Sequence, residues 1–70
     1  MKTKIVSVLF YDGRVARCFA DCKDCIAYMR KRVAYGGDYY TITFKSPTRI
    51  EYTDETGQAH AYWWTDYEVE

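Results

Sequence analysis

The sequence predicts a small α+β domain in which one helix packs on a mostly antiparallel sheet, in the order ββαβββ. Three observations support this prediction: a tight-turn signal between two strand-like segments, one amphipathic segment with a helical period, and three further strand-like segments joined by short connections. A chain of 70 residues that is 49% hydrophobic is expected to form a single domain, residues 1–70. It is too short for a barrel or a doubly wound sheet.

The first predicted unit is a β-hairpin. Residues 3–11 are rich in β-branched and aromatic side chains, and residues 14–19 resume an alternating pattern after Asp12 and Gly13. These two intervening residues tolerate the positive φ angles that a type I′ turn requires. We therefore expect two antiparallel strands joined by a two-residue turn.

The next segment is predicted to be a helix that begins near Cys22. Asp21 can accept a hydrogen bond from the first helical turn, and Gly36 and Gly37 end the segment. The basic residues 30–32 are interpreted as partners of the negative end of the helix dipole. The apolar residues follow a 3.6-residue period and form one stripe, which consists of Cys22, Cys25, Ile26, Met29 and Val33.

Three strands are predicted after the helix, over residues 38–45, 49–54 and 59–69. Their connections are short, which favours an antiparallel meander. A single helix can cover only one face of such a sheet, so the other face is expected to be exposed to solvent and to carry the function.

The predicted core consists of apolar side chains that alternate toward the helix. In the last strand we assign Trp63 to the core together with Ala61 and Tyr67, so that Tyr62 and Trp64 point outward. The full predicted set is Val6, Val8, Phe10, Val15, Phe19, Cys22, Ile26, Met29, Val33, Ile42, Phe44, Ile50, Tyr52 and Trp63.

The residues left on the outward face predict a protein-binding surface with aromatic, hydroxyl and acidic groups. Tyr and Trp are enriched among the residues that dominate binding at protein interfaces. The alternative interpretation is a structural cluster that caps the sheet, since these residue types also favour strands. The predicted binding residues are Tyr39, Thr41, Glu51, Tyr62, Trp64 and Asp66.

Charge is unevenly distributed along the chain although the formal net charge is zero. Residues 1–49 contain all ten Lys and Arg residues and four acids, whereas residues 50–70 contain six acids and no Lys or Arg. The functional interpretation is an acidic surface that faces a partner with a basic surface. The alternative is that the two halves pair with each other within one sheet.

The three cysteines suggest a possible metal site and an intracellular location. Cys18, Cys22 and Cys25, together with His60, have the residue types of a zinc site that could staple a small domain. We instead expect the cysteines to pack as small apolar residues without a cofactor. An odd number of cysteines favours a reducing compartment, so a cytoplasmic location is expected, in the host cytoplasm if the protein is phage-encoded. No apolar run approaches the length of a membrane span.

These features lead to the hypothesis of a non-enzymatic protein-binding module, an inhibitor or an adaptor. In its small size and its single small domain the chain resembles the small inhibitors and antidefence proteins, anti-CRISPR proteins among them, that phages and mobile elements encode. No phosphate-binding loop, catalytic metal motif or pair of carboxylates in a pocket predicts an enzyme. A homodimer formed through an exposed strand edge is also compatible with the pattern.

Nucleic-acid binding is the alternative function. It would use Lys23, Arg30 and Lys31 on the helix, because the strand that carries both tryptophans contains acids and no basic residue.

Overall fold

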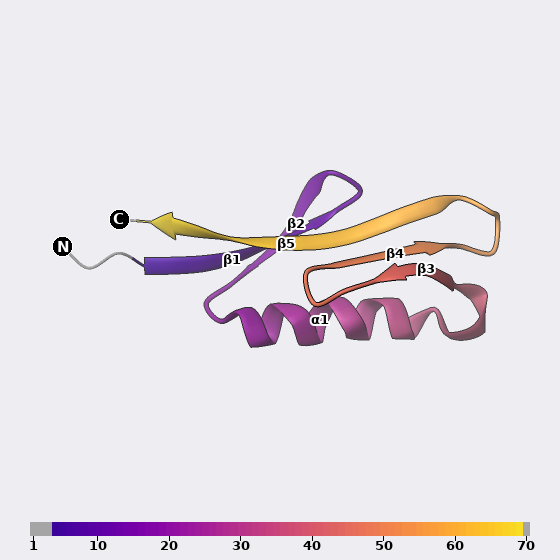
Figure 1. The fold of residues 1–70 in the computed structure, drawn as a ribbon, viewed down its shortest axis with the longest axis horizontal. Coiled ribbons are helices and arrows are strands. Elements are labelled where there is room, and N and C mark those ends of the chain that lie inside the picture. Colours follow the sequence, from indigo (N-terminus) through magenta and orange to yellow (C-terminus); the bar gives the residue numbers. More distant parts are fainter. Residues whose placement is uncertain (1–3, 70) are drawn as a thin grey trace.

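The computed structural model describes residues 4–69 and confirms the α+β order ββαβββ. Within these residues five strands form one antiparallel sheet, and one α-helix lies along one side of it (Figure 1). The strands are β1 (Lys4–Tyr11), β2 (Arg14–Phe19), β3 (Thr41–Lys45), β4 (Arg49–Thr53) and β5 (Ala59–Val69). The helix is α1 (Cys22–Tyr35), and a short 3-10 turn, η1 (Gly37–Tyr39), follows it.

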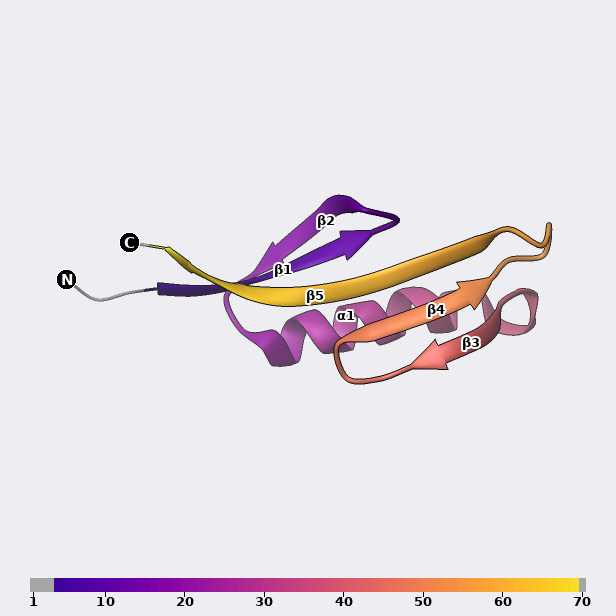
Figure 2. The same cartoon turned by 45° about the horizontal axis from the view of Figure 1, so that its top comes forward.

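The strand order in the sheet is β2-β1-β5-β4-β3, so β5 is central. It pairs with β1 over residues 62–69 and with β4 over residues 59–63. The two hairpins therefore extend along different parts of β5, and Figure 2 shows the resulting elongated sheet, with β1, β2 and β5 above α1 and with β4 drawn across the helix. The short connections predicted for the last three strands are confirmed.

The predicted hairpin turn is confirmed at Asp12 and Gly13, whose φ angles are 50° and 85°. Asp12 also ties this turn to the central strand. Its backbone N–H donates to the Ala61 carbonyl at 2.9 Å, and its carboxylate accepts from the Ala61 N–H at 2.8 Å. The predicted start of the first strand at Thr3 lies outside the described residues.

The helix begins and ends where the sequence predicts. Asp21 accepts a hydrogen bond from the Lys23 N–H at 2.8 Å, which satisfies a free donor of the first turn. Gly36 ends the helix, and a Cβ atom there would collide with the Tyr40 ring. The chain then turns through η1, so residues 38–40 are not part of β3, and the prediction that this strand begins at residue 38 is wrong.

The hydrophobic core lies between α1 and the sheet. The core prediction is confirmed at Met29, Val33, Ile50 and Tyr52, and Phe19 packs against this core in a half-buried position. The complete set of buried apolar side chains is Leu9, Cys25, Met29, Val33, Ile50, Tyr52 and Tyr62. Of these, Tyr62 was predicted to point away from the helix, and Leu9 lies between Val8 and Phe10, which were predicted to be core in its place.

The predicted orientation of β5 is wrong, and strand pairing explains why. Ile50 lies opposite Tyr62 in the antiparallel pair of β4 and β5. Residues directly opposite each other in such a pair point to the same face of the sheet. Because Ile50 is buried under the helix, Tyr62 is buried beside it and Trp63 points to the opposite face, where its ring stacks on Phe10 at 4.1 Å.

The same reversal applies to the first hairpin. Phe10 lies opposite both Trp63 and Val15, so these side chains share the face away from the helix. Val6 and Val8 precede Phe10 by four and two residues in the same strand, so they lie on the same face. Val15 on this face is 61% exposed. The prediction that these four residues contribute to the core under the helix is therefore wrong.

The predicted core residues of β3 are also largely exposed. Ile42 and Phe44 are each 48% exposed, because β3 is an edge strand and α1 packs over β1, β2, β4 and β5. A bulge between these two residues changes the phase of the strand, so that Ile42 lies opposite Tyr52 and Phe44 lies opposite Glu51. The two side chains therefore point to different faces.

Substituting the buried and exposed residues of the first hairpin tests the assignment of its two faces. We expect Leu9→Ala to lower the free energy of unfolding by about 2 to 5 kcal/mol, because it leaves a cavity in the core. Val15→Ala is expected to change it by no more than about 0.5 kcal/mol, as for other exposed sites. Urea denaturation followed by circular dichroism measures both values, and a larger loss for Val15→Ala would contradict the assignment.

Candidate functional site

The six residues predicted to form one outward surface lie in three places. Strand pairing puts Thr41 and Glu51 on the face away from the helix, and Tyr39 lies in η1, where it is 68% exposed. The other three lie on the helix side of β5, and these are Tyr62, Trp64 and Asp66. The prediction that Tyr62 and Trp64 point outward is therefore wrong, and the six residues do not form one patch.

The contacts of these three β5 residues show their structural roles. Tyr62 is only 7% exposed, and Trp64 packs against the core while its indole N–H donates to the Pro47 carbonyl at 2.8 Å. Asp66 accepts a hydrogen bond from the hydroxyl of the buried Ser7.

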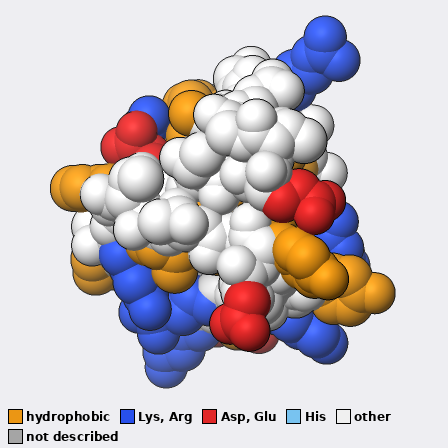
Figure 3. Space-filling model, turned by 90° about the vertical axis from the view of Figure 1, so that its right-hand side faces the viewer, with side chains coloured by type: hydrophobic (Ala, Val, Ile, Leu, Met, Phe, Trp, Pro, Cys, Tyr) orange, Lys and Arg blue, Asp and Glu red, His pale blue; other side chains and the backbone are white. Residues whose placement is uncertain are grey.

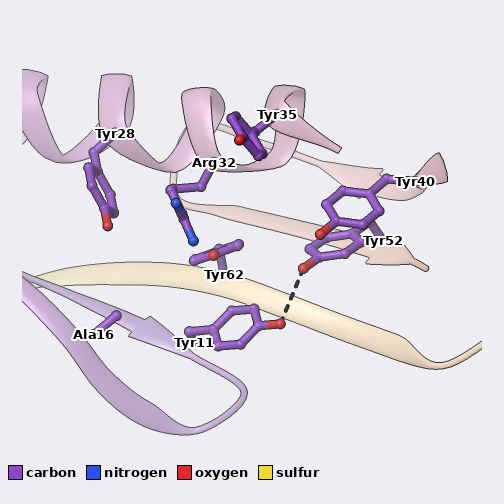
Figure 4. Close-up of a pocket in the computed structure, with 8 residues that line it drawn as sticks. All are labelled: Tyr11, Ala16, Tyr28, Arg32, Tyr35, Tyr40, Tyr52 and Tyr62. Atoms are coloured by element: carbon purple, nitrogen blue, oxygen red, sulfur yellow. Dashed lines mark hydrogen bonds between the residues drawn. The ribbon is translucent and has the colours of Figure 1, made fainter. Parts of the chain in front are cut away.

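A pocket of about 260 Å³ lies between the second half of α1 and the sheet (Figure 4). Arg32 and Ala16 contribute to its lining. The remaining lining residues are six of the eight tyrosines of the chain: Tyr11, Tyr28, Tyr35, Tyr40, Tyr52 and Tyr62. We call this cavity the tyrosine pocket.

Helical spacing and strand pairing bring the lining residues together. Tyr28, Arg32 and Tyr35 are separated by four and three residues, so they lie on one side of α1. Tyr52 and Tyr62 rise from neighbouring strands on the face that the helix covers. The pocket thus has a buried floor in the sheet and a more exposed rim on the helix.

The protonation states of the pocket are set by burial and by Arg32. Burial raises the pKa of Tyr52 and of Tyr62, so both are neutral phenols that can donate hydrogen bonds at physiological pH. The neighbouring Tyr62 hydroxyl raises the pKa of Arg32, which stays charged. Figure 4 shows Arg32 directed from the helix toward Tyr62.

A second polar cluster lies at one end of the sheet and joins two turns. His60 Nδ1 lies 2.6 Å from the Asp12 carboxylate in the β1–β2 turn, and His60 Nε2 lies 2.8 Å from the Asp54 carboxylate in the β4–β5 turn. The Tyr11 hydroxyl lies 3.1 Å from His60 Nδ1 and 3.3 Å from the Tyr52 hydroxyl. Tyr11 therefore connects this histidine cluster to the tyrosine pocket.

The carboxylates and the imidazole of this cluster stabilise each other's charged forms. Hydrogen bonds to Asp12 and Asp54 raise the pKa of His60 above its ordinary 6.5. Hydrogen bonds from Thr56 and His60 lower the pKa of Asp54. At Asp12 desolvation acts in the opposite direction, but the hydrogen bonds from His60 and the Ala61 N–H prevail and lower its pKa.

The side of the sheet away from α1, which we call the open face, is mainly apolar. Its central feature is the stacked pair of Phe10 and Trp63, whose rings are inclined by only 10°. Its charged groups near this centre are Arg49 and Glu51, which form an ion pair at 3.2 Å. Strand pairing assigns to this face the apolar residues Val6, Val8, Phe10, Val15, Phe44, Trp63 and Tyr67.

The three cysteines lie in different environments within residues 4–69 and are not clustered with His60. Cys25 is fully buried and its burial raises the thiol pKa to about 11, whereas Cys18 is exposed on β2. Both ring nitrogens of His60 are engaged by carboxylates. Across residues 4–69 no three His, Cys, Asp or Glu side chains are arranged to hold a metal ion.

Sequence reasoning missed both polar sites. The helical spacing of Tyr28, Arg32 and Tyr35 was a usable signal for one wall of the pocket, because it places an arginine between two aromatic rings. The contact of His60 with Asp12 joins residues 48 positions apart and had no local signal.

Comparisons with known proteins leave the chain without an assigned family: no family model matches the sequence, and no match was found among curated proteins or solved structures. In the part of the chain that the structure describes, no helix has both the length and the apolar character needed to cross a membrane.

The histidine cluster predicts how stability depends on pH. The contribution of His60 is complete below pH 6.5 and is lost as the pH rises through its raised pKa, because deprotonation removes one of the two N–H donors. The contributions of Asp12 and Asp54 are lost as the pH falls below their ordinary value of 3.8. We expect the free energy of unfolding to be highest between these limits and to decline from pH 6 to 9.

Urea denaturation at a series of pH values measures this dependence, with His60→Asn as the matched variant. His60→Asn is expected to be less stable than the parent at pH 6 and to show a flatter profile from pH 6 to 9. An equally steep decline in the variant would show that His60 does not cause the pH dependence.

Proposed function

We propose that the chain is a small non-enzymatic protein-binding module, an inhibitor or adaptor that acts by covering another protein's surface with its open face. The observation that carries this proposal is that a five-stranded sheet has one helix on one side and an apolar, aromatic surface on the other. Exposed apolar patches on small soluble proteins commonly mark interaction sites. The helix-side residues Tyr62 and Trp64 take no part in this surface.

The charge of the open face defines the chemistry of the partner. The Arg49 and Glu51 charges compensate each other, Asp54 is paired with His60, and Asp66 lies on the helix side. Figure 3 views the molecule from the end that carries the β4–β5 turn, and there Lys and Arg side chains gather on the side where α1 lies. The open face therefore suits a flat, apolar and uncharged partner surface, in place of the basic one that the sequence suggested.

The size of the face limits how it can be used. The five strands contain about 35 residues, which cover roughly 570 Å² in projection at a rise of about 3.4 Å and a spacing of about 4.8 Å. Specific interfaces usually bury about 800 Å² per partner, and about 600 Å² marks the lower end. A partner must therefore cover essentially the whole face of the sheet, with the Phe10 and Trp63 stack near the centre of the contact.

Two matched double variants test this surface. Val15→Ser with Tyr67→Ser removes an aliphatic and an aromatic group from the open face, where they are 61% and 48% exposed. Ile42→Ser with Tyr39→Ser removes the same kinds of group outside it, where they are 48% and 68% exposed. After affinity capture from host lysate, the captured partner is purified and its affinity for each variant is measured by calorimetry.

We expect the open-face variant to weaken binding at least tenfold and the control variant to change it less than twofold. The affinity should vary little with salt, because apolar contacts are not screened. Equal losses in both variants would contradict the proposal. Sedimentation of the isolated chain as a dimer that only the open-face variant disrupts would also contradict it, because a second copy would then occupy the face.

A further inference from the structure

The tyrosine pocket has a chemistry that the proposed docking surface does not use. It opens between α1 and the sheet, whereas the open face lies on the other side of the same sheet (Figure 4). Its volume of about 260 Å³ corresponds to roughly nine water-sized groups at about 30 Å³ each. The space is therefore suited to a molecule of about that many non-hydrogen atoms.

The charge of the lining favours an anionic ligand. Among the described residues that line the pocket, Arg32 is the one that carries a charge, and none of them is a carboxylate. The phenol hydroxyls of Tyr52 and Tyr62 are neutral because burial raises their pKa values, so they can donate hydrogen bonds to an anion. A cationic ligand would be repelled by the guanidinium group.

The single guanidinium favours a carboxylate over a phosphate. Arg presents its N–H groups as a planar fork that matches the two oxygens of a carboxylate. A phosphate dianion carries about twice the charge and is usually bound by a cluster of basic groups. The tyrosine pocket offers one basic group among its described lining residues, and the Tyr62 hydroxyl lies beside it.

The walls of the pocket favour a flat ring. The Tyr40 ring stacks on Tyr52 with centroids 4.3 Å apart, and the Tyr11 ring lies 4.5 Å from Tyr62. All four rings line the cavity, where a planar aromatic group can make offset or edge contacts with them. Tyr35 is 87% exposed at the rim, so it can close over a bound ring by rotating its side chain.

We propose that the tyrosine pocket binds a small aromatic carboxylate, with the carboxylate at Arg32 and the Tyr62 hydroxyl and with the ring between the tyrosines of the floor and rim. This site is separate from the open face, so the proposed ligand binding does not depend on the proposed protein binding.

Benzoate is the probe for this site, and benzamide is the matched neutral molecule of the same size and shape. Each is titrated into the isotopically labelled chain while backbone and tyrosine ring signals are followed by NMR. Benzoate is expected to shift the signals of the residues that line the pocket and to bind at least tenfold more tightly than benzamide. Inorganic phosphate, titrated separately, is expected to bind at least tenfold more weakly than benzoate.

The variants separate the guanidinium from the general positive charge of the helix. Arg32→Gln is expected to weaken benzoate binding at least tenfold, and Arg32→Lys to weaken it severalfold, because the ammonium keeps the charge but loses the fork. Arg30→Gln removes an exposed charge two residues earlier, on another side of α1, and should change the affinity less than twofold. Circular dichroism establishes that each variant is folded before titration.

Each of the following results would overturn part of this proposal. Equal binding of benzoate and benzamide, or equal effects of Arg32→Gln and Arg30→Gln, would overturn the role of Arg32. Binding of inorganic phosphate as tight as that of benzoate would overturn the aromatic specificity. Absence of shifts with benzoate at 20 mM, or shifts confined to residues outside the pocket, would overturn the site itself.

Discussion

The structure depends on one constraint: a single helix must cover one face of a five-stranded sheet whose central strand is β5. Because β5 pairs with both β1 and β4, its orientation decides which side chains of both neighbours face the helix. Ile50 opposite Tyr62 on one side of β5 and Leu9 opposite Trp64 on the other fix that orientation. The core, the tyrosine pocket and the open face all follow from this arrangement.

The features that local sequence determines were predictable. The turn at Asp12 and Gly13 needs positive φ angles, and the helix needs a cap at Asp21 and a residue without a side chain at Gly36. Each requirement is satisfied within a few neighbouring residues, so the order ββαβββ and most element boundaries could be predicted. The exception is η1, which replaces the predicted start of β3.

The face of the sheet to which each strand side chain points could not be predicted in the same way. Residues 5–10 contain five apolar side chains and one serine, so both faces of β1 look like core, and residues 62–64 place large aromatic rings on both faces of β5. The two bulges add to this difficulty, because each changes the phase within a strand without a proline or glycine to mark it. Only the pairing with β4, where Ile50 and Tyr52 alternate with polar residues, resolves the choice.

The tyrosine pocket is a physical consequence of building a small core from phenols. Leu9, Met29 and Val33 fill part of the space under the helix, and Tyr52 and Tyr62 supply much of the rest. A buried hydroxyl without a hydrogen-bond partner is costly, so these rings must pack with their oxygens directed to one shared polar region. The contact between the Tyr11 and Tyr52 hydroxyls, and the position of Arg32 beside Tyr62, show this solution.

The arrangement of charge follows from the same sheet. The acidic segment of the sequence forms most of β4, the β4–β5 turn and β5, and two of its acids have partners close by in the chain: Glu51 pairs with Arg49 of the same strand, and Asp54 pairs with His60 of β5. Near the centre of the open face the charges of Arg49 and Glu51 therefore compensate each other. What remains is a basic helix side around an arginine-containing pocket and a neutral apolar face opposite it, so the two surfaces suit ligands of different chemistry.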